Sequence, residues 1–132
     1  MKYKKLIIAP HADDDVLGCG GIFDKDCLIL YCGIDESSVR SNRPSYDDRT
    51  SEIEKAKNFT GHEYKILNNL VNHYDDYELI DQVEKVVEEV KPEEVYLPHP
   101  SYNQDHRAVY DGCMVALRPH DKNFFVKKNI RL

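Results

Sequence analysis

Two short segments of the chain concentrate side chains that could bind a metal ion and activate water. The first, His11-Ala12-Asp13-Asp14-Asp15, places one imidazole and three carboxylates in five consecutive residues after an apolar segment. Carboxylates held this close repel one another unless a cation lies among them. A loop that only caps the next helix would explain Asp14 or Asp15, but neither the histidine nor the number of acids. The segment therefore predicts a cation site.

The second segment, His99-Pro100-Ser101-Tyr102-Asn103-Gln104-Asp105-His106, adds two histidines and a further carboxylate. Asn103 is a good helix N-cap, and Asp105 would suit the positive end of a helix dipole, so both also have a structural interpretation. His106 would lie in the first helical turn, where the dipole favours the neutral imidazole that metal binding requires. This segment could therefore supply a second imidazole ligand.

Together the two segments contain the ligands of a hydrolytic zinc site. Two imidazoles and one carboxylate, with a fourth position left to water, are the usual arrangement. The ion lowers the pKa of water towards about 7 and polarises a carbonyl group. A spare carboxylate beside the metal can accept the proton of the water, and Asp13 is the candidate for that role.

The elements that position these segments alternate between strand and helix. Apolar strands are predicted at 5–10, 27–32, 63–67 and 94–98, helices are predicted to begin near 16, 45, 75 and 103, and residues 124–130 could add at most one strand. This alternation implies an α/β fold with a mostly parallel sheet of four or five strands and helices on both faces. Ligands bind such sheets beyond the carboxyl ends of the strands, where the strand order reverses. Common strand orders place the first strand beside the fourth, which would bring the two segments together.

Local signals define two of the helices. Ser45 and Asp48 form a capping-box pattern, and Gly61 is expected to end the helix that they open. Asp75 and Glu78 resemble a second capping box. It opens the helix with the clearest apolar stripe, formed by Leu79, Ile80, Val83, Val86, Val87 and Val90.

Composition limits the class of protein. With 132 residues the chain predicts a single domain spanning 1–132. A net charge of -6 argues against a nucleic-acid partner. No apolar stretch is long enough to span a bilayer, and the N-terminus does not read as a signal peptide. The four cysteines form no Cys-x-x-Cys pair and are expected to be mostly reduced core thiols, so a cytoplasmic location is expected. A homo-oligomer is compatible with these features.

The two segments also carry a family resemblance. Pro10-His11-Ala12-Asp13-Asp14-Asp15 resembles the Pro-His-Pro-Asp-Asp-Glu motif of PIG-L/LmbE-like zinc-dependent N-acetylglucosaminyl deacetylases, and glycines follow it at Gly18, Gly20 and Gly21. Asn103-Gln104-Asp105-His106 resembles the second motif of this family, His-x-Asp-His. Arg49-Thr50-Ser51-Glu52 is similar to its Arg-x-x-Glu helix. The resemblance extends from residue 4 to about residue 119 and implies a Rossmann-like, three-layer α/β/α fold.

Carried over by position, the resemblance implies one zinc ion on His11, Asp14 and His106. It implies Asp13 as the general base, and we place Asp105 and Asn103 in the catalytic group as well. The expected substrate is an N-acetylated sugar or glycoconjugate of the N-acetylglucosamine type, deacetylated by metal-activated water.

The chain departs from the family pattern at several positions. Ala12 replaces proline, and Asp15 replaces a glutamate that orients the loop. Asn103 replaces the first histidine of the second motif. An asparagine can donate a hydrogen bond to an oxyanion but cannot carry a proton, although His73 or His99 could substitute. Family members usually continue well beyond this sequence, so we expect a short or truncated member that lacks the usual C-terminal extension.

Candidate substrate-binding residues flank the predicted metal site. Arg40, Arg43 and Arg49 occur within ten residues of an acidic chain. They are either solvent-exposed surface residues or an anion-binding site for a phosphate, nucleotide or carboxylate group of the substrate. Arg49 and Arg43 are the main candidates for binding that group. Tyr102 could stack on a sugar, and His99 could contact the substrate.

Two alternative functions remain open at this point. One is a non-catalytic module of the same fold that binds metal or sugar, and the other is an amidohydrolase acting on a non-sugar amide.

Overall fold

The computed structural model describes residues 3–12, 24–99, 103–118 and 128–131. Within these ranges the strands are β1 (Lys5–Ala9), β2 (Cys27–Tyr31), β3 (Glu63–Ile66), β4 (Glu94–Leu97) and β5 (Lys128–Arg131). They form one sheet in the order β3-β2-β1-β4-β5, and every described pairing is parallel. The prediction of a mostly parallel sheet with the first strand beside the fourth is confirmed. Residues 124–130 were expected to add at most one strand, and β5 begins within that range.

The helices begin and end close to the predicted residues. Helix α2 (Tyr46–Thr60) is opened by a capping box in which Ser45 and Asp48 bond reciprocally, and it ends at Gly61, whose φ of 80° is left-handed. Helix α3 (Asp76–Val90) is capped by Asp75, whose side chain accepts from Tyr77 N. Helix α4 (Gln104–Ala116) begins at the predicted N-cap, and a short 3-10 helix, η2 (Glu36–Ser38), follows β2. The helix expected from about residue 16 lies outside the described residues.

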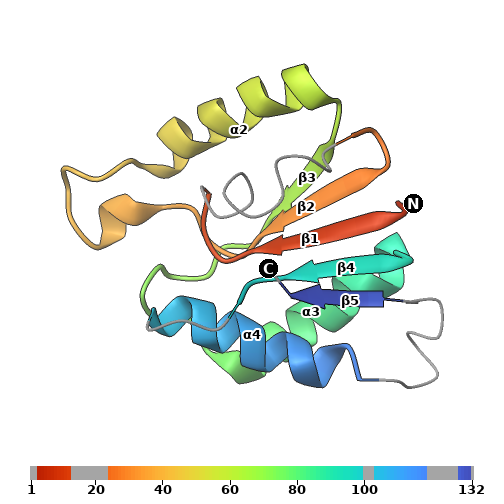
Figure 1. Cartoon of the computed structure of the whole chain (residues 1–132). Coiled ribbons are helices and arrows are strands. Elements are labelled where there is room, and N and C mark those ends of the chain that lie inside the picture. The colour runs from red at the N-terminus through yellow and green to blue at the C-terminus, as the bar shows by residue number, and fades with distance from the viewer. Residues whose placement is uncertain (1–2, 13–23, 100–102, 119–127, 132) are drawn as a thin grey trace.

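The sheet is covered on both faces (Figure 1). Alternate residues of β1 and β2 therefore enter two separate cores. On one face Leu6, Ile8 and Leu30 pack with the apolar stripe of α3 and with the inner side of α4. On the other face the intervening strand residues pack with Ile53 of α2. The three layers agree with the predicted α/β/α fold.

Three of the cysteines belong to these cores. Cys27, Cys32 and Cys113 are free and buried, and burial raises the pKa of Cys113 to about 12, so its thiol is neutral. No described helix is both long and apolar enough to cross a membrane.

Parallel pairing fixes where the polar segments meet. Strand β1 pairs with β2 from Lys5 opposite Cys27 and with β4 from Lys5 opposite Glu94. The loops that leave the carboxyl ends of β1, β2, β3 and β4 therefore share one edge of the sheet. Residues near position 11 and near position 105 are far apart in the sequence, yet they become neighbours at this edge.

Candidate metal centre and the adjoining pocket

The two predicted imidazole ligands lie beside each other at the carboxyl edge of the sheet. The rings of His11, just after β1, and His106, in the first turn of α4, have centroids 5.5 Å apart and planes inclined at 55°. A zinc ion with Zn–N bonds of about 2.0–2.1 Å and tetrahedral angles would hold two imidazole centroids roughly 5.2 Å apart. The observed separation therefore fits a pair of imidazoles that share one zinc ion.

The carboxylate of Asp105 orients His11. Asp105 is fully buried, and its Oδ2 lies 2.8 Å from His11 Nε2. Asn72 N donates to the same oxygen at 2.6 Å, and Tyr74 N donates to Oδ1 at 3.3 Å. Histidines that bind metals almost always donate their second ring nitrogen to such a carboxylate or carbonyl. Because Nε2 is engaged by Asp105, His11 would coordinate through Nδ1.

Tyr74 supports the same histidine from the loop after β3. Its hydroxyl donates to Pro10 O at 2.6 Å and lies 3.2 Å from Gly33 O, while its ring centroid is 5.7 Å from that of His11. Gly33 makes this approach possible, since a Cβ there would lie less than 3.0 Å from the Tyr74 hydroxyl. The backbone that carries His11 is thereby fixed from two neighbouring loops.

Asn103 has a structural role in addition to its predicted catalytic one. Its Oδ1 accepts from Asp105 N at 2.9 Å and from His106 N at 3.2 Å, which caps α4. The next residue, Gln104, donates from Nε2 to Tyr74 O at 2.9 Å. These bonds fix the first turn of α4, which carries both Asp105 and His106, against the loop after β3. With Oδ1 turned to the helix, the amide nitrogen of Asn103 is the atom that can donate to a substrate.

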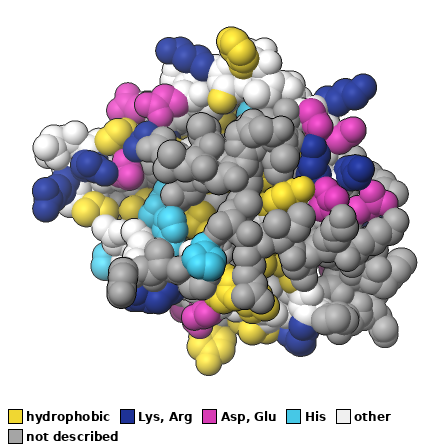
Figure 2. All heavy atoms as spheres, viewed as in Figure 1, with side chains coloured by type: hydrophobic (Ala, Val, Ile, Leu, Met, Phe, Trp, Pro, Cys, Tyr) yellow, Lys and Arg dark blue, Asp and Glu magenta, His cyan; other side chains and the backbone are white. Residues whose placement is uncertain are grey.

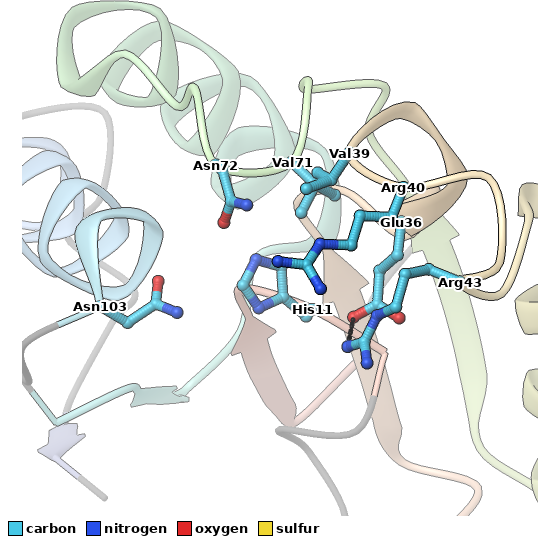
Figure 3. A pocket seen from close by; sticks show the side chains of 8 residues that line it. All are labelled: His11, Glu36, Val39, Arg40, Arg43, Val71, Asn72 and Asn103. Carbon is cyan, nitrogen blue, oxygen red and sulfur yellow. Dashed lines mark ion pairs between the residues drawn. The ribbon is translucent and has the colours of Figure 1, made fainter.

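An open pocket of about 360 Å³ adjoins His11. Its lining residues come from the loops after β1, β2 and β3 and from the cap of α4: His11, Glu36, Val39, Arg40, Arg43, Val71, Asn72 and Asn103 (Figure 3). Histidine side chains also gather on this face of the space-filling view, with basic and acidic groups beside them (Figure 2). The volume lies within the range of about 300–1,000 Å³ that is typical of small-molecule sites.

The three arginines of the predicted anion-binding site have different environments. Arg43 lines the pocket, is 55% exposed, and lies 3.6 Å from Glu36. Arg49 is only 11% exposed and bonds to Glu36 at 2.7 Å and to Glu52 at 3.0 Å, outside the pocket lining. Arg40 lines the pocket, and among the described residues it has no ion pair.

The structure brings some of the predicted site residues together and leaves others apart. His11, Asp105, His106 and Asn103 form one cluster. His99 is exposed and does not line the pocket, and the same is true of His73. The predicted base, third metal ligand and stacking aromatic (Asp13, Asp14 and Tyr102) lie outside the described residues. Within the described part of the chain alone, no three His, Cys, Asp or Glu side chains form a metal site.

Sequence reasoning missed the contribution of the loop after β3. Asn72, with a left-handed φ of 71°, supplies both a pocket wall and a donor to Asp105, and Tyr74 supports His11. The only signal that could have indicated this loop was its position, because every loop at the carboxyl edge of a parallel sheet is a candidate for the site.

Comparisons with known proteins identify a family and a shared fold. The PIG-L family model, described as GlcNAc-PI de-N-acetylase, matches residues 6–117. No curated protein matches the chain. The conserved protein TT1542 from Thermus thermophilus has a similar structure, with a TM-score of 0.81 and 21% identity over 98% of this chain and 65% of that chain.

A second similar structure is that of GalB, the 4-carboxy-2-hydroxymuconate hydratase from Pseudomonas putida KT2440. Its TM-score is 0.61, with 18% identity over 89% of this chain and 58% of that chain. This chain thus spans less than two thirds of the length of either protein. At these identities the likeness establishes the shared fold.

Proposed function

Because the family model matches residues 6–117, this chain belongs to the PIG-L family, and from that premise we propose that it is a zinc-dependent N-deacetylase. Its substrate would be an N-acetylglucosamine-type sugar or glycoconjugate, from which it releases acetate. The observation that carries the proposal is the pair of imidazoles, His11 and His106, with Asp105 bonded to the first at 2.8 Å beside an open pocket.

Zinc would be held by His11, Asp14 and His106, and all three ligands follow the family pattern. When bound, the ion polarises the amide carbonyl and lowers the pKa of the water beside it. Asp13 accepts the proton of the attacking water and returns it to the leaving amine. The amide nitrogen of Asn103 donates a hydrogen bond to the oxyanion that develops on the carbonyl oxygen.

Asp105 acts through His11 in this mechanism. Its carboxylate is fully buried and accepts from three donors of the protein, so it is placed to orient the imidazole rather than to touch the substrate. A fixed Nε2–H bond selects the tautomer whose Nδ1 lone pair can bind the metal. Asp105 is therefore a positioning residue of the proposed catalytic group.

The test combines metal analysis with acetate release. We expect about one zinc ion per chain, acetate release from N-acetylglucosamine derivatives, and loss of both in His11→Ala. Asp13→Asn should keep the metal and lose most of the activity, because an amide cannot accept the proton. Asp111→Asn, on the exposed side of α4, is the matched control and should keep both. Equal zinc content in wild type and His11→Ala would overturn the metal assignment.

The same experiment separates the alternatives. Asn103 in place of the family histidine favours a module that binds metal or sugar without hydrolysing it, since asparagine cannot carry a proton. Zinc binding with sugar binding but no acetate release would establish that function. Hydrolysis of simple N-acetylated amines but not of sugars would instead establish an amidohydrolase for non-sugar amides.

A further inference from the structure

We propose that a second pocket, next to the one that adjoins His11, binds an uncharged apolar group, aryl or alkyl, linked to the amino sugar. This inference rests on the proposed function and specifies the substrate class. The second pocket has a volume of about 270 Å³. Ile34 and Asp35 line it from the loop after β2, Tyr46 from the start of α2, and residues 67–70 from the loop after β3.

The two pockets share two wall segments. Asp35 lines the second pocket, while Glu36, the next residue, lines the first. Leu70 and Val71 divide between the pockets in the same way. Figure 3 shows Glu36 and Val71 around the pocket that contains His11. A substrate whose acetamide group lies near His11 can therefore extend a substituent across one of these segments into the second pocket.

The second pocket is more apolar than the first. Four of its seven described lining residues are hydrophobic, whereas the first has two valines among eight. Arginines line the first pocket, but among the described residues that line the second the charged side chain is the carboxylate of Asp35. Burial of apolar surface favours binding, and a carboxylate in the wall disfavours an anion. This lining therefore selects an uncharged apolar group.

The size of the second pocket fits a substituent better than a whole ligand. Complete small-molecule sites typically measure about 300–1,000 Å³, and an apolar cavity of about 150 Å³ accepts benzene. At about 270 Å³, the second pocket lies between these two values. It can therefore hold an aromatic ring or a short alkyl chain, while the amino sugar occupies the larger pocket beside His11.

Two of the hydrophobic side chains in the second pocket contact water in the free protein. Leu70 is 54% exposed and Tyr46 is 41% exposed. An apolar group bound there would cover their surface, and covering it would strengthen binding.

Hydrogen bonds hold the walls of the second pocket in place. Asn69 Nδ2 donates to Cys32 O and to Gln82 Oε1, both at 2.9 Å, which fixes the loop after β3 against the loop after β2 and against α3. Asp35 Oδ1 accepts from Ser37 N at 3.0 Å and caps η2. Because the walls are already ordered, little conformational entropy is lost when a ligand binds.

The experiment compares Leu70→Gln and Tyr46→Gln with two exposed controls outside both pockets, Met114→Gln and Tyr77→Gln. Acetate release would be measured as kcat/KM on the methyl, octyl and phenyl glycosides of N-acetylglucosamine. We expect the wild type to favour the phenyl or the octyl glycoside over the methyl glycoside about 10-fold or more. This ratio should fall about 5- to 10-fold in each pocket variant and stay unchanged in the controls. Because every protein receives the same glycosides, differences in their intrinsic reactivity cancel.

A second measurement is independent of turnover. Calorimetry would determine the affinity of each protein for the same three glycosides, and the pocket variants should weaken binding of the phenyl or octyl glycoside by a similar factor. Binding of that glycoside that depends on Leu70 and Tyr46, without acetate release, would uphold the second pocket and overturn the proposed hydrolysis. Acetate release whose preference is identical in wild type, Leu70→Gln and Tyr46→Gln would overturn the second pocket and leave the hydrolysis standing.

Discussion

Replacing Asp105 with asparagine tests whether the buried carboxylate orients His11. The substitution preserves the size of the side chain but changes one oxygen into an amide group. In the structure Oδ2 accepts from His11 Nε2 and Asn72 N, and Oδ1 accepts from Tyr74 N. If the remaining oxygen keeps the two donors of Oδ2, the new amide group must face the N–H of Tyr74, and two donors then oppose each other.

The size of the effect follows from these bonds. A buried donor left without an acceptor costs about 1–3 kcal/mol, so the metal-free protein should lose that much free energy of unfolding. The bond to His11 also loses its charge, and charge-assisted bonds are roughly twice as strong as neutral ones. Loss of such a partner of a metal-binding histidine typically weakens metal affinity about 10- to 100-fold, which we expect for Asp105→Asn.

Two measurements on the same preparations check this reasoning. The dissociation constant of zinc is obtained by competition with a chelator, and the free energy of unfolding is obtained from urea titrations with EDTA present. Asp111→Asn lies on the exposed side of the same helix and makes the same chemical change, so it should resemble the wild type. Equal zinc affinity in Asp105→Asn and Asp111→Asn would refute the positioning role. Absence of zinc binding in all three proteins would instead refute the metal centre.

Three further perturbations have expected outcomes. Tyr74→Phe removes the hydroxyl that donates to the buried Pro10 O and should lower the free energy of unfolding by about 1–3 kcal/mol. Tyr77→Phe, at a side chain that is 80% exposed, should change it by less than about 0.5 kcal/mol in the same urea titration. Gly33→Ala should cost about 1–3 kcal/mol, because its Cβ would lie less than 3.0 Å from both the Tyr74 hydroxyl and the backbone oxygen of Asn69. The double variant Gly33→Ala/Tyr74→Phe relieves the clash with the hydroxyl but keeps the one with Asn69 O, so it should cost less than the sum of the two; strict additivity would contradict the hydroxyl clash. Burial lowers the pKa of His62 below its ordinary value of 6.5. As the pH falls below 6.5, this histidine therefore binds a proton more readily in the unfolded chain than in the native protein. The free energy of unfolding from urea titrations should therefore decrease between pH 7 and pH 5, and it should decrease less in His62→Phe than in the wild type. Equal slopes of this free energy against pH in the two proteins would refute the argument.

The fold was predictable because its local signals agree with one another. Ser45 with Asp48 opens α2, Gly61 ends it, and Asn103 caps α4, as their residue types indicate. The alternation of strands and helices then leaves few topologies, and the adjacency of β1 and β4 follows from the common strand orders. The meeting of His11 with His106 was predictable for the same reason.

The partners within the site were not predictable, because a motif specifies residue types and not which atoms meet. Asp105 has a plausible role as a first-turn acid, and nothing in the sequence indicates that it accepts from His11. The arginine cluster raises the same difficulty. The family pattern favours Arg49, but whether an arginine faces the pocket depends on Glu36, whose bond to Arg49 crosses from η2 to α2.

The loop after β3 supports the site although it supplies none of the proposed metal ligands. Asp105 on α4 and Tyr74 after β3 connect the chain segments that leave β1, β2, β3 and β4, through bonds to His11, Pro10 and Gly33. A histidine on a loop would lose much conformational entropy when it binds a metal, unless the fold has already restricted it. Here the restriction comes from parallel strands whose carboxyl ends lie at one edge, so each loop can bond to its neighbour. Disturbing the loop after β3 should therefore weaken zinc binding although no ligand is removed.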